Sequence, residues 1–380
     1  MLSVFENDPY FDERHRALEE KVRAFGDRSL RAGADDEARP EQRTREVARA
    51  LGEAGLLAAA VTAPHGNMDL RSLVAVREGL AYFSGLADSA FAMQGLGSHA
   101  LSLASTDVQR NRWLPEVVRG TILCAFAVTE PEAGSDLAAV RTRAQRDGAL
   151  WRLSGVKTFI SNAGIAGLYT VLARSSEGDA HRGLSVFLVD AEAPGIVVRK
   201  LEPMAAHPLG EVRFEGTPAV LLGEAGDGYA TVLATLDTFR PSVGAAACGL
   251  ARRALDESLR QARSRRQFGH ALADFQSVQM ALADMHTELC AARLVVRHAA
   301  WLKDQGAARI ARPGAAAKLL ATETAQRVVD RAVQIHGGQG VMKGATVERL
   351  YREVRALRIY EGTSEVQKLV IARQLLKEKR

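Results

Sequence analysis

The hydrophobic pattern changes twice along this chain of 380 residues. Apolar residues follow helical spacing up to about residue 120, and that spacing returns after Gly228. Between these regions, short runs rich in β-branched residues are separated by turn residues. This order predicts an α+β architecture with an N-terminal helical domain over 1–120, a central antiparallel β domain over 121–224 and a C-terminal helical bundle over 225–380.

The helical regions have specific predicted boundaries. In the C-terminal region, apolar stripes over 278–299 and 317–335 indicate two bundle helices, with Pro313-Gly314 marking the break between them. Pro40 suits the first turn of a helix. The helices predicted before residue 120 cover 11–30, 41–57, 70–83 and 89–105.

The central region has the turn chemistry of an antiparallel sheet or barrel. Asp147-Gly148 is a strong signal for a two-residue hairpin. The predicted strands are 122–128, 140–146, 149–154, 168–173, 184–189, 196–200 and 212–215.

Composition and charge narrow the function classes. The chain is 47% hydrophobic and 25% charged, which is ordinary for a soluble globular protein. The net charge of +5 comes from scattered arginines without interleaved aromatic residues, so nucleic-acid binding is not expected. The same charge would suit an anionic ligand or an acidic redox partner.

The cysteines and histidines give no sign of a metal site or disulfide. Cys124, Cys248 and Cys290 lie far apart among small or apolar residues, and the nine histidines form no HxxxH pair. We therefore expect buried thiols, no metal and a reducing compartment. Residues 1–10 lack an apolar core and no run is long enough to span a membrane, which predicts a cytoplasmic protein without membrane insertion.

Four residues near the C-terminus, Tyr360-Glu361-Gly362-Thr363, indicate a general base. A glutamate between an aromatic residue and a glycine can reach an apolar cleft, where loss of water raises its proton affinity. The alternative is a surface salt bridge between Glu361 and Arg358.

Three further segments stand out in the sequence, and each has a structural interpretation. Segment 125–136 reads as a strand ending in a turn at Thr129, or as a strand before a helix-capping loop. The Arg265 guanidinium matches the paired oxygens of a pyrophosphate, although neighbouring arginines also fit a solvated face. Segment 334–340 follows a helix, so it is no Rossmann loop, and it also suits a helix C-cap.

Together with 157–164, these motifs resemble the acyl-CoA dehydrogenase family, in family order and over nearly the whole chain. The resemblance implies an FAD-dependent enzyme that oxidises the α,β carbon–carbon bond of an acyl-CoA thioester. It implies that Glu361 removes the α-proton while hydride leaves the β-carbon for flavin N5. The backbone N–H of Glu361 and a flavin ribityl hydroxyl would then stabilise the thioester oxygen.

The resemblance also implies the remaining contacts. Phe159 and Ser161 stand where Trp and Thr are the more familiar types. Arg265, Gln334, Gly337 and Gly338 would reach FAD from a neighbouring subunit. The implied cofactor-binding residues are Phe126, Val128, Thr129, Ser135, Phe159, Ser161, Arg265, Phe268, Gln276, Gln334, Gly337, Gly338, Thr363 and Glu365. The implied substrate-binding residues are Ser135, Asp237, Arg240, Tyr360 and Gly362.

Some family members carry the base on an earlier helix, just before an arginine. Phe239 occupies that place here, so no rival carboxylate exists. Two segments depart from the family pattern: the loop over 204–216, which includes His207-Pro208, and Glu365, which replaces a more usual Gln. In relatives, the loop that matches 204–216 borders the substrate and the cofactor, so the sequence does not identify the acyl group.

The expected partners follow from the same resemblance. An electron-transfer flavoprotein would reoxidise the flavin, and the protein would assemble as a homotetramer or at least a dimer. Alternatives are a relative that acts on an acyl carrier protein thioester or uses oxygen, and a non-catalytic protein that binds acyl thioesters. A binding module has no need of a base, so the set Thr129, Arg265 and Glu361 favours an enzyme.

Overall fold

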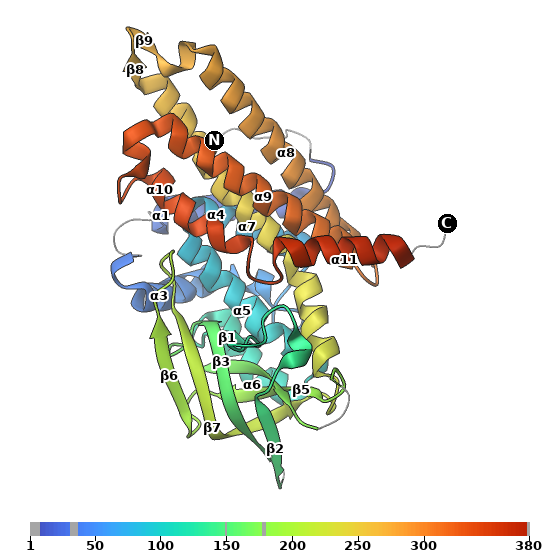
Figure 1. Ribbon diagram of the computed structural model, residues 1–380. Coiled ribbons are helices and arrows are strands. Elements are labelled where there is room, and N and C mark those ends of the chain that lie inside the picture. Colours follow the sequence, from blue (N-terminus) through green and yellow to red (C-terminus); the bar gives the residue numbers. More distant parts are fainter. Residues whose placement is uncertain (1–7, 31–36, 149, 177–179, 378–380) are drawn as a thin grey trace. The chain divides into compact units, whose positions relative to one another are not determined.

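The computed structural model describes residues 8–30, 37–148, 150–176 and 180–377 (Figure 1). The chain divides into two units, which are described separately: unit 1 is Met1–Ala34, Leu70–Asp88 and Asp237–Arg380, and unit 2 is Asp35–Asp69 and Ser89–Leu236. The expectations for residues 1–7 and for Ala149 lie outside the described residues.

Unit 1 is built from helices. Helix α4 packs against α1 and α8, and α9 packs against α8, α10 and α11. Helix α7 begins in unit 2 and continues through unit 1 from Asp237. The helices are α1 (Glu13–Ser29), α4 (Leu70–Phe83), α7 (Gly228–Ser264), α8 (Gln276–Asp304), α9 (Ala311–His336), α10 (Thr346–Leu357) and α11 (Ser364–Lys377), with short elements β8 (Arg266–Gln267), β9 (His270–Ala271), η3 (Leu272–Asp274) and η4 (Gly337–Val341).

The predicted break at Pro313-Gly314 is wrong. Helix α8 ends at Asp304 and α9 begins at Ala311, so the break covers 305–310, where Gly306 has a φ of 87°. Pro313 is the third residue of α9. A proline is tolerated there because the first N–H groups of a helix have no intrahelical partner.

Unit 2 combines helices with a seven-stranded sheet. Gly97 lies within α5, where an added Cβ would come 2.6 Å from the Cβ of Cys124, so the glycine allows close packing. The helical elements are α3 (Pro40–Glu53), η1 (Leu57–Ala60), α5 (Gly85–Ala104, shared with unit 1), α6 (Asp107–Arg119) and η2 (Leu137–Ala139). The strands, green to yellow-green in Figure 1, are β1 (Cys124–Ala127), β2 (Arg143–Asp147), β3 (Leu150–Ser161), β4 (Leu168–Arg174), β5 (Leu184–Asp190), β6 (Ile196–Leu201) and β7 (Leu209–Leu222).

The strand pairings form a closed circuit of β2, β3, β7, β5 and β4, with β1 and β6 joined to its sides. Most pairs are antiparallel, as predicted, but β1 and β2 both run parallel to β4. Cores lie on both faces of the sheet: one includes Trp113 and Leu172, the other Tyr169 and Phe214. The α+β class with a central β domain between helical regions is confirmed.

Two local features of the sheet bear on the site. The predicted hairpin forms, but Asp147 is the last residue of β2 and pairs with Leu150, so the turn lies one residue later than predicted. Gly148 has a φ of 62°. The register of β3 against β7 shifts between Lys157 and Ile160, which marks a β-bulge.

The segment 204–216 is not a loop throughout. Its second half, from Leu209, belongs to β7, and the connection from β6 covers only 202–208. Within the part of the chain that the structure describes, none of the helices has the length and apolar character needed to cross a membrane.

Candidate active site

Glu361 lies in the loop between α10 and α11 of unit 1, in a backbone conformation that side-chain-bearing residues avoid. Its φ is 53°, and Gly362 follows with a φ of 94°. A non-glycine residue in this left-handed region costs about 1–2 kcal/mol, so its surroundings must stabilise the conformation. Gly362 cannot be replaced freely, because an added Cβ would lie 2.6 Å from Nε2 of Gln367.

Two buried side chains hold the main-chain carbonyls of this loop. Lys318 of α9 donates from Nζ to the Tyr360 carbonyl oxygen at 2.6 Å and also to the Gly362 carbonyl. Gln367 of α11 donates from Nε2 to the Gly362 carbonyl at 2.8 Å and to the Glu361 carbonyl at 3.3 Å. We call Lys318 and Gln367 the carbonyl clamp.

A buried ion pair reaches the loop from α4 and α5. Arg77 binds Asp88 through two parallel hydrogen bonds of 2.8 Å and donates to Oγ of Ser242 at 2.9 Å. The positive charge of Arg77 also acts on the carboxyl of Glu361. Burial works to lower the pKa of Arg77, but Asp88 more than offsets this and the pKa is raised. Arg77 therefore stays a cation beside the loop.

Arg240 supplies a further cation from α7. Its Nη1 lies 2.5 Å from Oδ1 of Asp237, and the side chain is buried. Two of the five residues that the sequence nominated for substrate contact, Asp237 and Arg240, are therefore a bonded pair, and the charge of Arg240 acts on Glu361.

Glu361 is half-buried, and one oxygen of its carboxylate, Oε2, is buried without a hydrogen-bond partner among the described residues. Burial raises the pKa of this carboxyl above its ordinary value, and the cations Arg77, Lys318 and Arg240 oppose that rise only in part. A carboxylate with an unbonded oxygen and raised proton affinity can accept a proton from a weak carbon acid.

The alternative of a surface salt bridge between Glu361 and Arg358 is wrong. Arg358 instead lies 2.9 Å from Glu323 of α9, which also accepts a hydrogen bond from Ser364 Oγ at 2.6 Å. The basic residue before the loop is thus engaged elsewhere.

The first flavin segment, in unit 2, ends strand β1. Phe126 and Thr129 are half-buried, Val128 is buried and Ser135 is exposed. The Thr129 carbonyl accepts a hydrogen bond from the Thr158 N–H at 2.9 Å, which ties this turn to the second segment.

The second segment places an aromatic ring outside the core. Phe159 is 65% exposed and has a φ of 57°, because it lies within the bulge of β3. Ser161, at the end of β3, is half-buried. An exposed aromatic ring on strained backbone is typical of a binding surface rather than of a core.

Arg265, Phe268 and Gln276 lie around the β8–β9 hairpin of unit 1, and all three are exposed. Phe268 is 90% exposed with a φ of 54°. Figure 1 shows this hairpin at the tip of α7 and α8, whereas the loop that carries Glu361 lies between α10 and α11. The hairpin and Glu361 are therefore separate parts of unit 1.

The 334–340 segment contains the end of α9 with its C-cap Gly337, as the C-cap interpretation predicts, and continues into η4. Gly337 has a φ of 59° and its N–H donates to the Gln334 carbonyl. Gln334, Gly337 and Gly338 are exposed, and a Cβ added at either glycine would meet nothing within 4 Å. A ligand can therefore approach this backbone closely.

Thr363 and Glu365 begin helix α11. Oγ1 of Thr363 accepts from the Val366 N–H at 3.3 Å, the pattern of an N-cap residue. Glu365 is exposed, and its own backbone and Thr363 lower the pKa of its carboxyl through hydrogen bonds. The pair thus stabilises the helix start after the loop.

Residue types that suit a flavin occur among the nominated residues. Exposed aromatic rings suit the isoalloxazine ring, and accessible glycine backbone suits the sugar–phosphate chain. An exposed arginine suits the pyrophosphate.

A cavity of about 440 Å³ lies in unit 2. It is lined by residues that include Arg45, Arg49 and Tyr169, and none of the nominated residues lines it.

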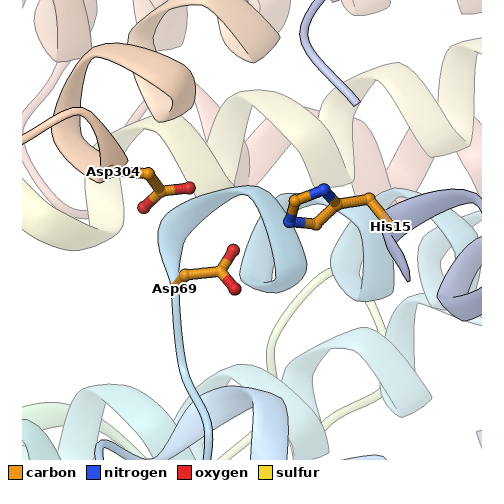
Figure 2. A group of neighbouring side chains, drawn as sticks. All are labelled: His15, Asp69 and Asp304. Carbon is orange, nitrogen blue, oxygen red and sulfur yellow. The ribbon is translucent and has the colours of Figure 1, made fainter. Parts of the chain in front are cut away.

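Figure 2 shows His15 and Asp304 of unit 1, with Asp69. The two oxygens of Asp304 accept hydrogen bonds from the Leu70 N–H at 2.8 Å and from Arg71. Nδ1 of His15 lies 2.8 Å from Asp12, the N-cap of α1. These bonds give His15 and Asp304 roles at the starts of α1 and α4, and they need no metal ion.

Sequence reasoning missed Arg77, Asp88, Lys318 and Gln367. Arg77 and Lys318 lie on apolar helix faces, since Leu73, Leu80, Ala321 and Ala325 around them are also buried. A charged residue on a buried face is the signal that could have found them.

Family comparisons match this architecture along most of the chain. The matching models are the acyl-CoA dehydrogenase N-terminal domain over 12–121, middle domain over 125–217 and C-terminal domain over 226–376. The chain belongs to the acyl-CoA dehydrogenase family, whose members are flavin-dependent oxidoreductases that typically use FAD. The resemblance found in the sequence is confirmed.

Individual relatives differ in their named reactions. The chain is 36% identical over 378 residues to a 3-(aryl)acrylate reductase of Clostridium sporogenes, covering 97% of this chain and 100% of the relative. It is 33% identical over 383 residues to a caffeyl-CoA reductase–Etf complex subunit of Acetobacterium woodii, covering 97% and 100%. The solved butyryl-CoA dehydrogenase of Megasphaera elsdenii aligns with a TM-score of 0.91 at 30% identity, covering 98% of this chain and 100% of that one.

Proposed function

We propose that this protein is an FAD-dependent acyl-CoA dehydrogenase that converts an acyl-CoA to its 2-enoyl thioester, with Glu361 as the α-proton base. The observation that carries the proposal is the buried Oε2 of Glu361, which lacks a partner among the described residues and belongs to a carboxyl with raised pKa.

The chemistry needs a base that becomes effective only when substrate excludes water. The α-proton of a thioester is a weak acid, so Glu361 must gain proton affinity by desolvation while the thioester oxygen is stabilised as negative charge develops. The backbone N–H of Glu361 would contribute to that stabilisation. Bound FAD would supply the acceptor at N5 for the hydride that leaves the β-carbon.

The proposed FAD contacts are those that the family resemblance implies. Phe126, Val128, Thr129, Ser135, Phe159 and Ser161 would surround the ring, with Thr363 and Glu365 near the cofactor, and Ser135, Asp237, Arg240, Tyr360 and Gly362 would contact substrate. Arg265, Phe268, Gln276, Gln334, Gly337 and Gly338 would reach FAD from a second copy of the chain. Their exposure supports this, since a second copy could contact them.

Assembly and electron transfer belong to the same proposal. Unit 1 exposes large apolar side chains, among them Phe268, Val341 and Leu376, which a homotetramer or dimer would cover. An electron-transfer flavoprotein as redox partner is supported by the Etf complex named for the caffeyl-CoA reductase relative. We retain 1–120, 121–224 and 225–380 as proposed domain boundaries.

The opposite direction is the second candidate, because two relatives are named reductases. The same glutamate, when protonated, would return the α-proton to an enoyl thioester. The raised pKa of Glu361 suits either direction.

Anaerobic flavin absorbance separates these functions. Oxidised holoenzyme should bleach with at least one acyl-CoA from a panel of straight, branched, cyclic and aromatic chains. A dithionite-reduced enzyme that is reoxidised by an enoyl-CoA, together with no bleaching by any acyl-CoA, would favour the reductase. Bleaching only by carrier-protein thioesters, or a purified protein without flavin, would contradict the proposal.

A further inference from the structure

The carbonyl clamp, Lys318 and Gln367, lies at the loop whose glutamate we assign as the base. Both side chains are buried, with exposed fractions of 1% and 0%. Burying a lysine is costly unless its ammonium is bonded, so its partners indicate what the residue is for. Its hydrogen-bond partners here are the carbonyls of Tyr360 and Gly362, the residues on either side of Glu361.

We propose that Lys318 is a positioning residue for Glu361, holding the loop in its left-handed conformation while Gln367 holds it from α11. This inference rests on the proposed function. The Tyr360 carbonyl is bonded by Lys318, the Glu361 carbonyl by Gln367 and the Gly362 carbonyl by both. Three successive carbonyls are thereby fixed, which sets the direction of the Glu361 side chain.

Lys318 also differs from Gln367 in carrying charge. The charged groups that act on Glu361 come from four helices: Arg77 of α4, Asp88 of α5, Arg240 of α7 and Lys318 of α9. Arg77 and Arg240 each have a bonded carboxylate, in Asp88 and Asp237. The hydrogen bonds of Lys318, in contrast, are to neutral carbonyls, so its charge is not already paired within the clamp.

Two consequences follow, and they can be separated. Removing the Lys318 charge should raise the pKa of Glu361, because a nearby cation favours the carboxylate. Removing either member of the clamp should disorder the loop. Gln367 is neutral, so its loss should affect only the loop.

The test compares four variants of the FAD-loaded enzyme with wild type: Lys318→Met, Lys318→Arg, Gln367→Met and, as matched control, Lys368→Met. Lys368 is exposed on α11, so removing its charge is screened by water. The measurements are kcat, KM, the acidic limb of the kcat/KM–pH profile, and amide hydrogen exchange over 359–364.

We expect Lys318→Met to lower kcat about 10- to 100-fold with little change in KM, since a small misplacement of a reacting group has effects of this size. Its acidic limb should move up by about one pH unit. Lys318→Arg should return the limb to the wild-type position, Gln367→Met should lower kcat without moving it, and Lys368→Met should behave as wild type.

An unmoved acidic limb in Lys318→Met, or an equal movement in Lys368→Met, would overturn the electrostatic role. If Lys318→Met does not fold, Lys318→Gln keeps a donor without the charge and must still move the limb. Hydrogen exchange tests the clamp without turnover: exchange over 359–364 should rise about tenfold in Lys318→Met, and unchanged exchange would overturn the positioning role. A wild type that turns over no acyl thioester would instead refute the proposed function.

Discussion

Two buried lysines, one in each unit, have similar surroundings but different carboxylates beside them. Lys157 of β3 donates to the Val128 carbonyl at 2.9 Å, and Lys318 of α9 donates to the Tyr360 carbonyl at 2.6 Å. Burial lowers the pKa of each lysine to about 8. The lysines alone therefore do not distinguish a structural site from a functional one.

The carboxylates do distinguish them. Glu130 accepts hydrogen bonds from Lys157 at 2.8 Å, from the Arg141 N–H at 2.7 Å and from the Thr142 N–H at 2.9 Å. Burial works to raise the pKa of Glu130, but Lys157 and these bonds prevail and lower it. Glu130 is thereby fixed as an anion, whereas Glu361 keeps an unbonded oxygen and a raised pKa.

The largest expected effect comes from Glu361→Gln, which keeps the side-chain shape and removes the base. Turnover of any acyl-CoA should fall by about 10³- to 10⁴-fold, near the upper range for a general base. Bound FAD, read from the visible spectrum after gel filtration, should be unchanged. Retained turnover would show that Glu361 is not the base.

Lys157→Met should instead act on stability. It leaves Glu130 buried without its cation, which costs about 3–5 kcal/mol when one partner of a buried pair is removed. Urea unfolding measures this loss. The double variant Lys157→Met/Glu130→Leu should recover only part of it, because the Arg141 and Thr142 N–H groups lose their acceptor. A single-variant loss below about 1 kcal/mol would mean that Glu130 and Glu361 are less different than the structure indicates.

The pH dependence of stability should have opposite signs at the two carboxylates. Because the pKa of Glu361 is raised, the folded state holds this proton more tightly than the unfolded state does. The contribution of Glu361 to the free energy of unfolding is therefore full below pH 4.5 and is lost as pH rises through the folded-state pKa. The free energy of unfolding of Glu361→Gln should therefore exceed that of wild type at pH 8 and equal it at pH 4. The difference at pH 8 should be about 1.4 kcal/mol for each unit by which folding raises the pKa of Glu361.

The carboxyl of Glu130 has a lowered pKa. Its contribution to the free energy of unfolding is therefore present above pH 4.5 and is lost as pH falls through the folded-state pKa. Glu130→Gln should accordingly be less stable than wild type at pH 8, with the difference shrinking in acid. Urea unfolding at both pH values checks the two signs, and the same sign for both variants would contradict the comparison.

The smallest expected effect is on cofactor retention. Arg265→Ala should weaken FAD binding about tenfold, the loss expected for a charge-assisted hydrogen bond at an exposed site. Arg263→Ala, an exposed arginine two residues earlier, is the matched control. Equal FAD content in both variants would remove Arg265 from the proposed pyrophosphate contact.

Much of the fold could be predicted from local patterns. The segment 70–83 was predicted as a helix and is α4, and the Asp147-Gly148 hairpin follows from turn chemistry. The break near Pro313 was misplaced because proline is compatible with the first turn of a helix as well as with a loop.

The site could be predicted only in part. Tyr360, Glu361 and Gly362 form one contiguous motif and could be found, although their roles remain proposals. Lys318 lies 42 residues from Tyr360 in sequence. No local pattern connects residues so far apart, because their contact depends on how α9 packs against the loop.

The bulge in β3 has a consequence for how this strand can change over time. Lys157 pairs with Val212 and Ile160 with Gly210, two positions apart on β7, so Lys157 and Ile160 share a face. Three positions separate them, and regular pleating would place them on opposite faces. Deleting one residue here would restore ideal pairing yet turn an aromatic ring inward or expel the ammonium. The number of residues between Lys157 and Ile160 is consequently more tightly constrained than their identity. This part of β3 should accept substitutions far better than insertions or deletions.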